Sequence, residues 1–281
     1  MISLRNKKIL VTGATGGIGI PLCKLLLQSG ASLVVTSGSQ DKLDQLVTTH
    51  YTHSGQIIAL QKNLLLEGSA AALVCKAQEQ LHGLDMVINL AGLQTFRALE
   101  NLSEEDISKQ IQLNLSVPIE TSKAAIRYFK TQRGGCIVNI GSAFGSIGFA
   151  QYSVYCATKF GLRGFSEALR RELQNTGINV VHIAPRATRT GMNSQGVYDM
   201  AGATGTHVDN PVVVAQRIVK AIVKQKPNTS IGFQESLFSK INGLFPSLVD
   251  KILSKQSSLA GSYANANISV NKSTITRETH A

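Results

Sequence analysis

The stretch SVYCATKFG, residues 153–161, places a tyrosine and a lysine four positions apart, Tyr155 and Lys159. Four residues make about one turn of an α-helix, so in a helix these two side chains share a face. A phenol beside an ammonium group can do general acid–base chemistry, but that chemistry also needs partner groups in a suitable geometry. Taken alone, the pair is better interpreted as two ordinary neighbours on a helix surface.

The elements that must position this pair are short β-rich runs that alternate with stretches of helical periodicity. Strands are predicted at 8–13, 32–37, 56–61, 85–92, 136–142, 178–185 and 229–233. Such alternation is typical of a parallel sheet covered by helices on both faces and joined by right-handed crossovers. Local signals agree, because Gly30 suits a helix C-terminus and Ser103, with Glu105 and Asp106 behind it, suits a helix N-terminus.

The first predicted strand runs into a glycine-rich turn, TGATGGIG, at residues 12–19. Between a strand and a helix, such a turn lets the backbone approach a pyrophosphate, and the helix N-terminus supplies amide donors and a positive dipole. The spacing fits two patterns, Gly13, Gly17, Gly19 and Gly13, Gly16, Gly19. The turn therefore predicts dinucleotide binding without fixing a subfamily.

Further motifs accompany the tyrosine and the lysine in a fixed order along the chain. In that order they are NLAG at 89–92, Asn114, Ser142, Tyr155 and Lys159. With these motifs the chain resembles the short-chain dehydrogenase/reductase family, in its single-domain branch, over about residues 5–233. The resemblance implies a Rossmann-type doubly wound α/β fold with a seven-stranded parallel sheet in the order 3-2-1-4-5-6-7, and a homodimer or homotetramer.

The resemblance also implies a catalytic role for four residues. Tyr155 would exchange a proton with the substrate oxygen, and Lys159 would lower a phenol pKa that is otherwise near ~10 and hold the nicotinamide ribose. Ser142 would hydrogen-bond the substrate oxygen, and Asn114 would hold a water molecule linked to the lysine. In isolation Ser142 is equally a strand-end cap and Asn114 a helix-surface amide, but chance placement of all four in this order is improbable.

A larger set of positions matches the cofactor contacts of the family. They are Gly13, Thr15, Gly16, Gly17, Ile18, Gly19, Ser37, Gly38, Ser39, Asn63, Leu64, Asn89, Ala91, Gly92, Tyr155, Lys159, Pro185, Thr188 and Thr190. At the end of the second strand, Ser37 and Ser39 stand where users of NAD place an acidic residue. Two hydroxyls and a turn suit a 2′-phosphate, so NADP is favoured over NAD, although the arginine usual in NADP users is absent. Arg186 stands where the family usually has glycine.

The expected substrate positions are mostly apolar, and they are Gln94, Ala143, Phe144, Phe149, Tyr152, Met192, Tyr198 and Met200. This set favours a hydrophobic carbonyl or alcohol, such as a 3-oxoacyl chain, a steroid-like molecule or another lipid. The alternative is that several of these residues merely pack the loop. The favoured function is thus an NAD(P)-dependent oxidoreductase, and the alternative is a nucleotide-sensing or scaffolding protein without turnover, for which all four catalytic groups would be unnecessary.

A wide apolar stripe follows the last predicted strand in ESLFSKINGLFPSLVDKILSK, residues 235–255. Its apolar residues recur at spacings of three and four, which predicts an amphipathic helix, and Pro246 is expected to break it into two short helices. The flanking cations are Lys240, Lys251 and Lys255. Three interpretations stay open: packing on the domain or a neighbouring subunit, contact with a membrane interface, or a lid over an apolar substrate.

These patterns divide the chain into three predicted parts. Residues 1–233 form a dinucleotide-binding and catalytic domain, and residues 234–256 form the amphipathic extension. After Gln256 the composition turns to Ser, Asn, Thr and Ala, and residues 257–281 are predicted to be disordered.

The formal charge of +11 is concentrated near the end of the chain, where residues 211–281 carry nine Lys or Arg against three Asp or Glu. No nucleic-acid-binding motif accompanies this excess, so nucleic acid is not the expected partner and an anionic membrane surface is the alternative. The cysteines show no metal-binding or disulfide spacing, and no metal is expected. The first residues, MISLRNKK, lack the apolar core of a secretory signal, so free thiols in a reducing cytoplasm are expected, with peripheral membrane contact as an additional possibility. No apolar run is long enough to predict a transmembrane helix.

Overall fold

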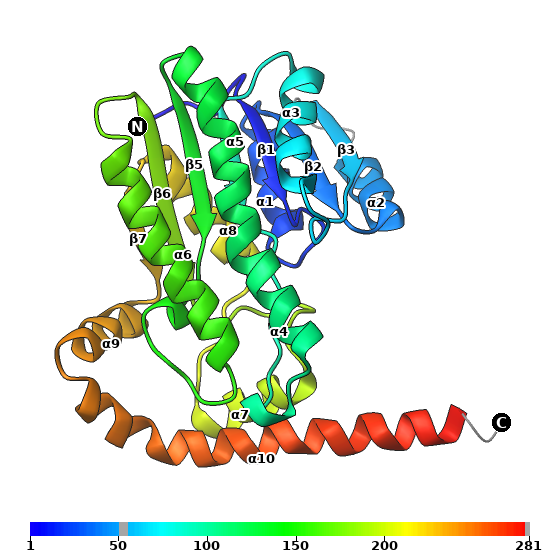
Figure 1. Cartoon of the computed structure of the whole chain (residues 1–281), viewed down its shortest axis with the longest axis vertical. Helices are drawn as coiled ribbons and strands as arrows, with labels where there is room; N and C mark the ends of the chain where they lie inside the picture. Colours follow the sequence, from blue (N-terminus) through cyan, green and yellow to red (C-terminus); the bar gives the residue numbers. More distant parts are fainter. Residues whose placement is uncertain (51–55, 279–281) are drawn as a thin grey trace.

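Seven parallel strands form one sheet in the order β3-β2-β1-β4-β5-β6-β7, in a computed structural model that describes residues 1–50 and 56–278 (Figure 1). The strands are β1 Lys8–Thr12, β2 Ser32–Ser37, β3 Ile57–Gln61, β4 Met86–Asn89, β5 Gly135–Ile140, β6 Ile178–Pro185 and β7 Asn228–Ile231. Each lies within or beside the range expected from the sequence. The predicted fold class and strand order are confirmed.

The sheet is buried on both faces, which is why its strands read as continuous apolar runs. Successive residues of a strand point to opposite faces, so Ile9 and Val11 join one hydrophobic cluster while Leu10 joins the other. In register, Val11 lies beside Val35 of β2 and Ile88 of β4. The central strands therefore contribute apolar side chains to two cores at once.

Helices cover the two faces of the sheet (Figure 1). Helices α1 and α8 contribute to the first core, and α3, α5 and α6 contribute to the second. The helices are α1 Gly19–Gln28, α2 Gln40–His50, α3 Ser69–Leu81, α4 Glu104–Ile111, α5 Val117–Thr131, α6 Ser153–Glu172, α7 Gln195–Thr204, α8 Pro211–Val223, α9 Phe233–Leu244 and α10 Pro246–Glu278. Short helical turns occupy Leu99–Asn101, Ala143–Gly145 and, as a π-helical segment, Gln112–Ser116.

The helix-end signals of the sequence match the structure. Ser103 precedes α4, and its hydroxyl accepts a hydrogen bond of 3.0 Å from the Asp106 amide. Gly30 follows the end of α1 with a φ of +80°, a left-handed conformation that favours glycine. The start of α1 lies at the carboxyl edge of the sheet, where ligands of doubly wound folds bind.

The C-terminal extension consists of α9 and α10, and α10 runs beneath α7 along one end of the molecule (Figure 1). Helix α10 begins at Pro246, as expected of a proline that interrupts the apolar stripe, but it runs on to Glu278, so the prediction that the second helix would be short is wrong. Ala260 and Ala264 are buried in a cluster that also contains Tyr152 and Met200. The boundaries predicted for the catalytic domain and for the amphipathic extension remain predictions.

The predicted disordered tail differs from the structure over residues 257–264, which belong to α10 and pack on the domain. Small residues explain this difference, because Ala260 and Ala264 let the helix approach closely, and a Cβ at Gly261 would lie 3.7 Å from Gln151 Nε2. The helix continues to Glu278, and residues 279–281 of the predicted tail lie outside the described residues.

Candidate active site

Tyr155 and Lys159 lie one turn apart near the start of α6, and both side chains are buried. The Lys159 Nζ lies 5.6 Å from the centroid of the Tyr155 ring and donates a hydrogen bond of 3.1 Å to the carbonyl oxygen of Ile140 at the end of β5. The shared helix face expected from the sequence is therefore an interior face, turned toward the carboxyl end of the sheet. Burial is incompatible with a mere surface pair.

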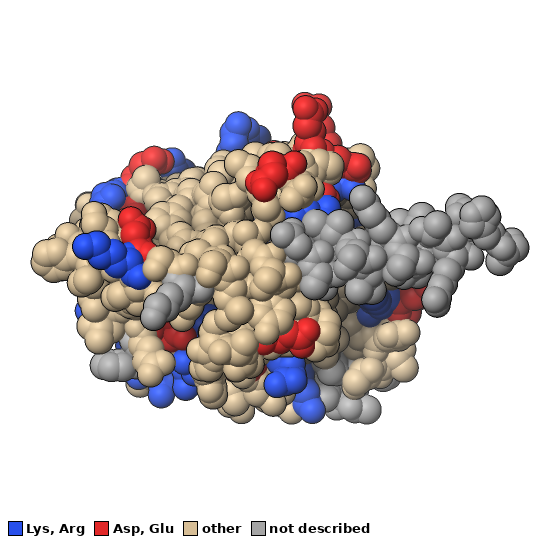
Figure 2. Space-filling model, turned by 90° about the horizontal axis from the view of Figure 1, so that it is seen from below, with Lys and Arg blue, Asp and Glu red and all other residues tan. Residues whose placement is uncertain are grey.

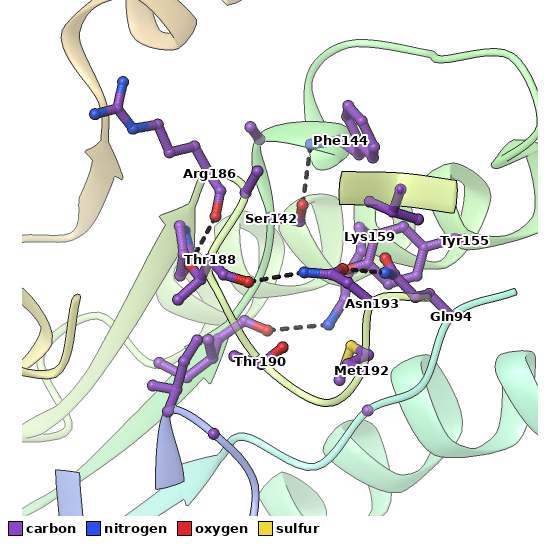
Figure 3. Close-up of a pocket in the computed structure, with 18 of the residues that line it drawn as sticks. Gln94, Ser142, Phe144, Tyr155, Lys159, Arg186, Thr188, Thr190, Met192 and Asn193 are labelled. Carbon is purple, nitrogen blue, oxygen red and sulfur yellow. Dashed lines mark hydrogen bonds between the residues drawn. The ribbon is translucent and has the colours of Figure 1, made fainter. Parts of the chain in front are cut away.

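Ser142 follows β5 and faces this pair (Figure 3). Its hydroxyl accepts a hydrogen bond of 3.1 Å from the Phe144 amide, so it caps the short turn Ala143–Gly145. The same hydroxyl lies near enough to the Tyr155 phenol to lower its pKa. The two interpretations of Ser142, as a cap and as a site residue, are therefore compatible.

Burial dominates the electrostatics of the pair. It raises the pKa of Tyr155 to about 12, while the neighbouring Ser142 hydroxyl acts in the opposite direction. Burial also lowers the pKa of Lys159 to about 8. The expected lowering of the Tyr155 pKa by the lysine is not found in the protein alone, where desolvation of the phenolate is the largest effect and raises the pKa. At neutral pH the phenol carries a proton that it can donate.

Asn114 lies in the π-helical segment Gln112–Ser116 and is fully buried. Its Oδ1 accepts a hydrogen bond of 2.8 Å from the Leu93 amide, and its Nδ2 donates to the Leu93 carbonyl at 2.8 Å and to Thr158 Oγ1 at 3.2 Å. A Cβ at Gly92 would lie 3.0 Å from Asn114 Oδ1 and 3.6 Å from Lys159 Nζ. Asn114 therefore joins the loop after β4 to α6 beside the lysine, although it does not line the cavity itself.

The glycine-rich turn leaves no room for side chains at three positions. Gly13 has a φ of +69°, and a Cβ there would lie 2.7 Å from the Ala91 backbone. A Cβ at Gly17 would lie 2.6 Å from Thr190 Cγ2, and one at Gly19 would overlap the carbonyl oxygens of Gly13 and Ala14. Gly16 is less crowded, since its Cβ would lie 3.3 Å from the nearest atom. Of the two spacings, sterics favour Gly13, Gly17 and Gly19, and the exposed cradle fits a pyrophosphate at the start of α1.

One cavity of about 980 Å³ extends from the glycine-rich turn to Tyr155 and the C-terminal helices. It is lined by most of the predicted cofactor positions and by all of the predicted substrate positions. Two predicted cofactor residues, Ser39 and Asn89, do not line it. Ser39 Oγ instead accepts a hydrogen bond of 3.4 Å from the Lys42 amide at the start of α2, and Asn89 is buried in a polar network with Asn139 and Thr121.

The loop after β6 is held by its own polar network (Figure 3). The Tyr198 hydroxyl donates to the Thr190 carbonyl at 2.7 Å and accepts from the Thr190 amide at 3.0 Å. Asn193 Nδ2 donates to the Thr188 carbonyl at 2.8 Å, and Gln94 Nε2 donates to Asn193 Oδ1 at 2.6 Å. Gln94 and Tyr198, expected at the substrate, line the cavity and also fix the loop that carries Thr188 and Thr190.

Aromatic rings form the cavity wall beside Tyr155. Phe144 and Phe149 stack with centroids 5.3 Å apart, and Tyr152 lies 5.1 Å from Phe144 and 6.1 Å from Tyr155. Burial strongly raises the pKa of Tyr152, so this second phenol is also neutral. The rings both pack the loop and present an apolar surface to the cavity, so the two interpretations of these residues hold together.

Several cavity residues were missed by sequence reasoning. They are Lys42, Lys62, Arg186, Asn193, Val197 and, from the C-terminal helices, Gln234, Glu235, Phe238, Ile252, Leu253 and Gln256. The register of β2 and β3 could have indicated Lys62, because Ser37 pairs with Gln61 and Lys62 follows directly. The contribution of α9 and α10 depends on how they fold back, which no local signal records.

Other kinds of site have little support in the described part of the chain. Among residues 1–50 and 56–278, no three or more His, Cys, Asp or Glu side chains are grouped as metal ligands would be. None of the described helices has both the length and the apolar character that crossing a bilayer requires. The cavity is therefore the candidate site.

The fold, the buried tyrosine and lysine and the glycine cradle together define a Rossmann-type oxidoreductase. The chain belongs to the short-chain dehydrogenase/reductase family, since the family model described as short chain dehydrogenase matches residues 7–200. The resemblance stated from the motifs is thereby confirmed.

Individual relatives give the same picture at modest identity. The chain is 31% identical to a ketoacyl reductase, HetN, of Nostoc sp., over 90% of each chain. It is 32% identical to the 3-oxoacyl-[acyl-carrier-protein] reductase FabG of Vibrio cholerae, over 68% of this chain and 77% of the relative. A short-chain dehydrogenase from Sphingobium yanoikuyae, solved in complex with NADPH, superposes with a TM-score of 0.75 at 25% identity, over 87% of this chain and 95% of that one.

Proposed function

We propose that the protein transfers a hydride between NADP(H) and a carbonyl or alcohol group of a hydrophobic substrate. The observation that carries the proposal is the placement of the buried Tyr155, Lys159 and Ser142 in one cavity, between a glycine cradle and an aromatic wall. A bound nicotinamide would supply or accept the hydride, and the residues of the chain would supply the rest of the chemistry.

In the reduction direction, Tyr155 would donate its proton to the substrate oxygen as negative charge develops there. Ser142, which lines the cavity beside Tyr155, would bind the same oxygen and align it with the phenol. Lys159 would stabilise the resulting phenolate, because its ammonium lies 5.6 Å from the ring centroid and both side chains are buried. Asn114 would hold α6 and the loop after β4 in place, and we assign it the water contact that the family resemblance implies.

Two lysines support a preference for NADP over NAD. Lys42 and Lys62 line the cavity at the end that holds Ser37, and the Lys62 amide donates a hydrogen bond of 3.0 Å to the Ser37 carbonyl. The Ser37 hydroxyl accepts a hydrogen bond of 2.8 Å from Thr15 Oγ1. Two ammonium groups and a hydroxyl suit a 2′-phosphate. They would replace the arginine that usually binds this phosphate in NADP users and that is absent here.

The apolar wall supports a hydrophobic substrate. Phe144, Phe149 and Tyr152 flank Tyr155, and Phe238 and Leu253 extend the wall into the C-terminal helices. Since two relatives are named as ketoacyl and 3-oxoacyl reductases, we take a 3-oxoacyl chain as the first substrate to test.

The decisive experiment follows the absorbance of NADPH in the presence of a substrate panel. The panel contains 3-oxoacyl thioesters of increasing chain length, steroid ketones and, as a polar control, ketoses. We expect oxidation of NADPH with the hydrophobic members and none with the ketoses. Binding of NADPH without turnover of any member would contradict the proposal and favour a sensing or scaffolding role.

We further propose that the extension contacts an anionic membrane surface through an apolar patch, here called the C-terminal patch. The patch consists of Leu237, Leu244, Phe245, Leu248 and Ile252, all at least half exposed. Exposed Lys240 and Lys251 lie on the same two helices. On the face that carries α7 and α10, uncharged residues cover the middle and charged residues lie mostly at the margins (Figure 2).

The energies favour such contact. Full burial of one large apolar side chain contributes about 1.5 to 3 kcal/mol, and each lysine near anionic lipid contributes about 1 kcal/mol. A homodimer or homotetramer, which the family resemblance implies, is the competing way to cover the patch.

The unpaired thiols, with Cys75 exposed, suit the reducing cytoplasm that we propose as the location.

A further inference from the structure

Arg186 occupies the first position after β6, where the family resemblance leads one to expect glycine. Its guanidinium points away from Tyr155 (Figure 3) and makes two parallel hydrogen bonds of 3.0 Å to the Asp209 carboxylate. Its Nη1 lies 3.4 Å from both carboxylate oxygens of Glu235. The side chains of Arg186, Asp209 and Glu235 are only 15%, 7% and 24% exposed, so these ion pairs are not ordinary surface contacts.

Asp209 connects the arginine to the cofactor loop, residues 186–193. Its amide donates a hydrogen bond of 2.8 Å to the Ala187 carbonyl, and its carbonyl accepts one of 2.9 Å from the Arg189 amide. Burial acts to raise the pKa of Asp209, but the hydrogen bonds and charge of Arg186 outweigh it and lower the pKa, so the carboxylate stays ionised. The loop that carries Thr188 and Thr190 is therefore tied to Asp209 by backbone and side chain alike.

Glu235 connects the same arginine to the cavity wall. It lies in the first turn of α9, and Gln234, Glu235 and Phe238 all line the cavity. Gly232 makes room for the pair, because a Cβ there would overlap Glu235 Oε2 and lie 3.0 Å from Arg186 Cδ. Arg186 thus stands between the cofactor loop and the helix that begins the C-terminal extension.

We propose that Arg186 is a positioning residue that couples the cofactor loop to α9, so that cofactor binding at the loop sets the position of the C-terminal cavity wall and thereby the affinity for substrate. The inference rests on the proposed function, since it deepens the working of the same site. It assigns to Arg186 and Glu235 a role that glycine at position 186 could not perform. A single guanidinium suits this role because its planar donor fork can bind two carboxylates at once.

Hydrogen–deuterium exchange of the full-length protein, with and without saturating NADPH, tests the coupling directly. In the parent protein NADPH should slow amide exchange both in 186–193 and in 233–244. In Glu235→Gln, which keeps the size of the side chain and loses its charge, NADPH should still protect the loop but should no longer protect α9. The matched control is Lys7→Gln, which removes the Lys7–Asp85 ion pair from the opposite end of the sheet and should respond like the parent.

Steady-state kinetics provide a second readout. In Glu235→Gln, the KM for the carbonyl substrate should rise about tenfold, while kcat and the KM for NADPH change less than about twofold. Arg186→Lys should show the same substrate effect, because an ammonium cannot reproduce the bidentate contact. Arg186→Gly should raise both KM values, and Glu235→Gln keeps the test decisive if that variant does not fold.

The outcomes separate the two proposals. The coupling would be overturned if NADPH did not slow amide exchange in α9 of the parent. It would also be overturned if NADPH slowed that exchange equally in Glu235→Gln. A fall in kcat with both KM values unchanged would overturn it as well. Parent protein that binds NADPH but reduces no carbonyl would refute the proposed function, and the exchange experiment would still decide on Arg186.

Discussion

Replacing Tyr155 with phenylalanine removes one hydroxyl group from the centre of the candidate site and leaves the ring in place. The ring packs against Tyr152, with centroids 6.1 Å apart, and lies over Lys159 Nζ at 5.6 Å, and phenylalanine preserves both contacts. Ser142 keeps the hydrogen bond of 3.1 Å that its hydroxyl accepts from the Phe144 amide. The variant is therefore expected to fold and to bind the cofactor.

The magnitudes follow from these contacts. Loss of the Tyr155 hydroxyl lowers the free energy of unfolding by no more than about 1 kcal/mol, the value of one neutral hydrogen bond, so Tm should shift by a few degrees at most. Loss of the proton donor lowers kcat by about 10²- to 10⁴-fold, the usual contribution of general acid–base catalysis. The expected signature is thus a large effect on turnover with almost none on stability or on cofactor affinity.

Three measurements check this signature: NADPH oxidation with the best substrate of the panel, NADPH binding by fluorescence titration, and a thermal melt. Ser142→Ala is the matched control, since it removes the other hydroxyl at the substrate oxygen. It should lower kcat as well, and by less. Turnover of the Tyr155→Phe protein within about tenfold of the parent would refute the assignment of Tyr155 as proton donor.

Ser37→Asp should reverse the cofactor preference, from tighter binding of NADPH to tighter binding of NADH, because the carboxylate repels a 2′-phosphate and can bond the ribose diol; equal affinities in the parent, by fluorescence titration, would contradict the serine and lysine interpretation. The stability of Lys159→Met relative to the parent should be highest below pH 8. In that range the parent buries a charged ammonium, because burial has lowered the pKa of Lys159 from 10.5 to about 8. As the pH rises from about 8 to 10.5 the unfolded state binds more protons than the native state, so the parent gains about 3 kcal/mol relative to the variant; urea unfolding that shows a constant difference would argue against a buried ammonium. The double variant Leu244→Ser with Phe245→Ser should no longer sediment with anionic vesicles but should keep its Tm, because these side chains are 73% and 61% exposed. If the parent does not bind the vesicles and the double variant dissociates into smaller oligomers, the C-terminal patch belongs to a subunit interface.

The sheet could be predicted because its strands carry apolar side chains to both faces. Residues such as Ile9, Leu10 and Val11 are all fully buried, so a run without polar interruptions marks a strand of this kind. Tyr155 and Ser142 could be found for a related reason. The carboxyl ends of parallel strands meet at one edge, and the chain order of the motifs places them there.

The cationic part of the site could not be predicted in the same way. Lys42, Lys62 and Arg186 lie on three different elements, and each is a surface residue by its type alone. The position of Lys62 follows from the register of β2 and β3, and that of Arg186 from its ion pairs with Asp209 and Glu235. These are contacts between residues far apart in the chain. A single sequence offers the residue types, and only the packed sheet and α9 bring them to the cavity.

The small residues of α10 make its sequence look disordered, and they also allow the helix to pack closely on the domain. Small residues at Ala260, Gly261 and Ala264 bury little apolar surface each, so composition predicts disorder. The same small side chains let α10 lie against α7 and the segment around Gln151, where Ala260 and Ala264 are almost fully buried. A helix that gains its stability from a close approach to a preformed surface leaves little periodic signal. Because Ile252, Leu253 and Gln256 of that helix line the cavity, part of the substrate wall depends on packing that the sequence does not display locally.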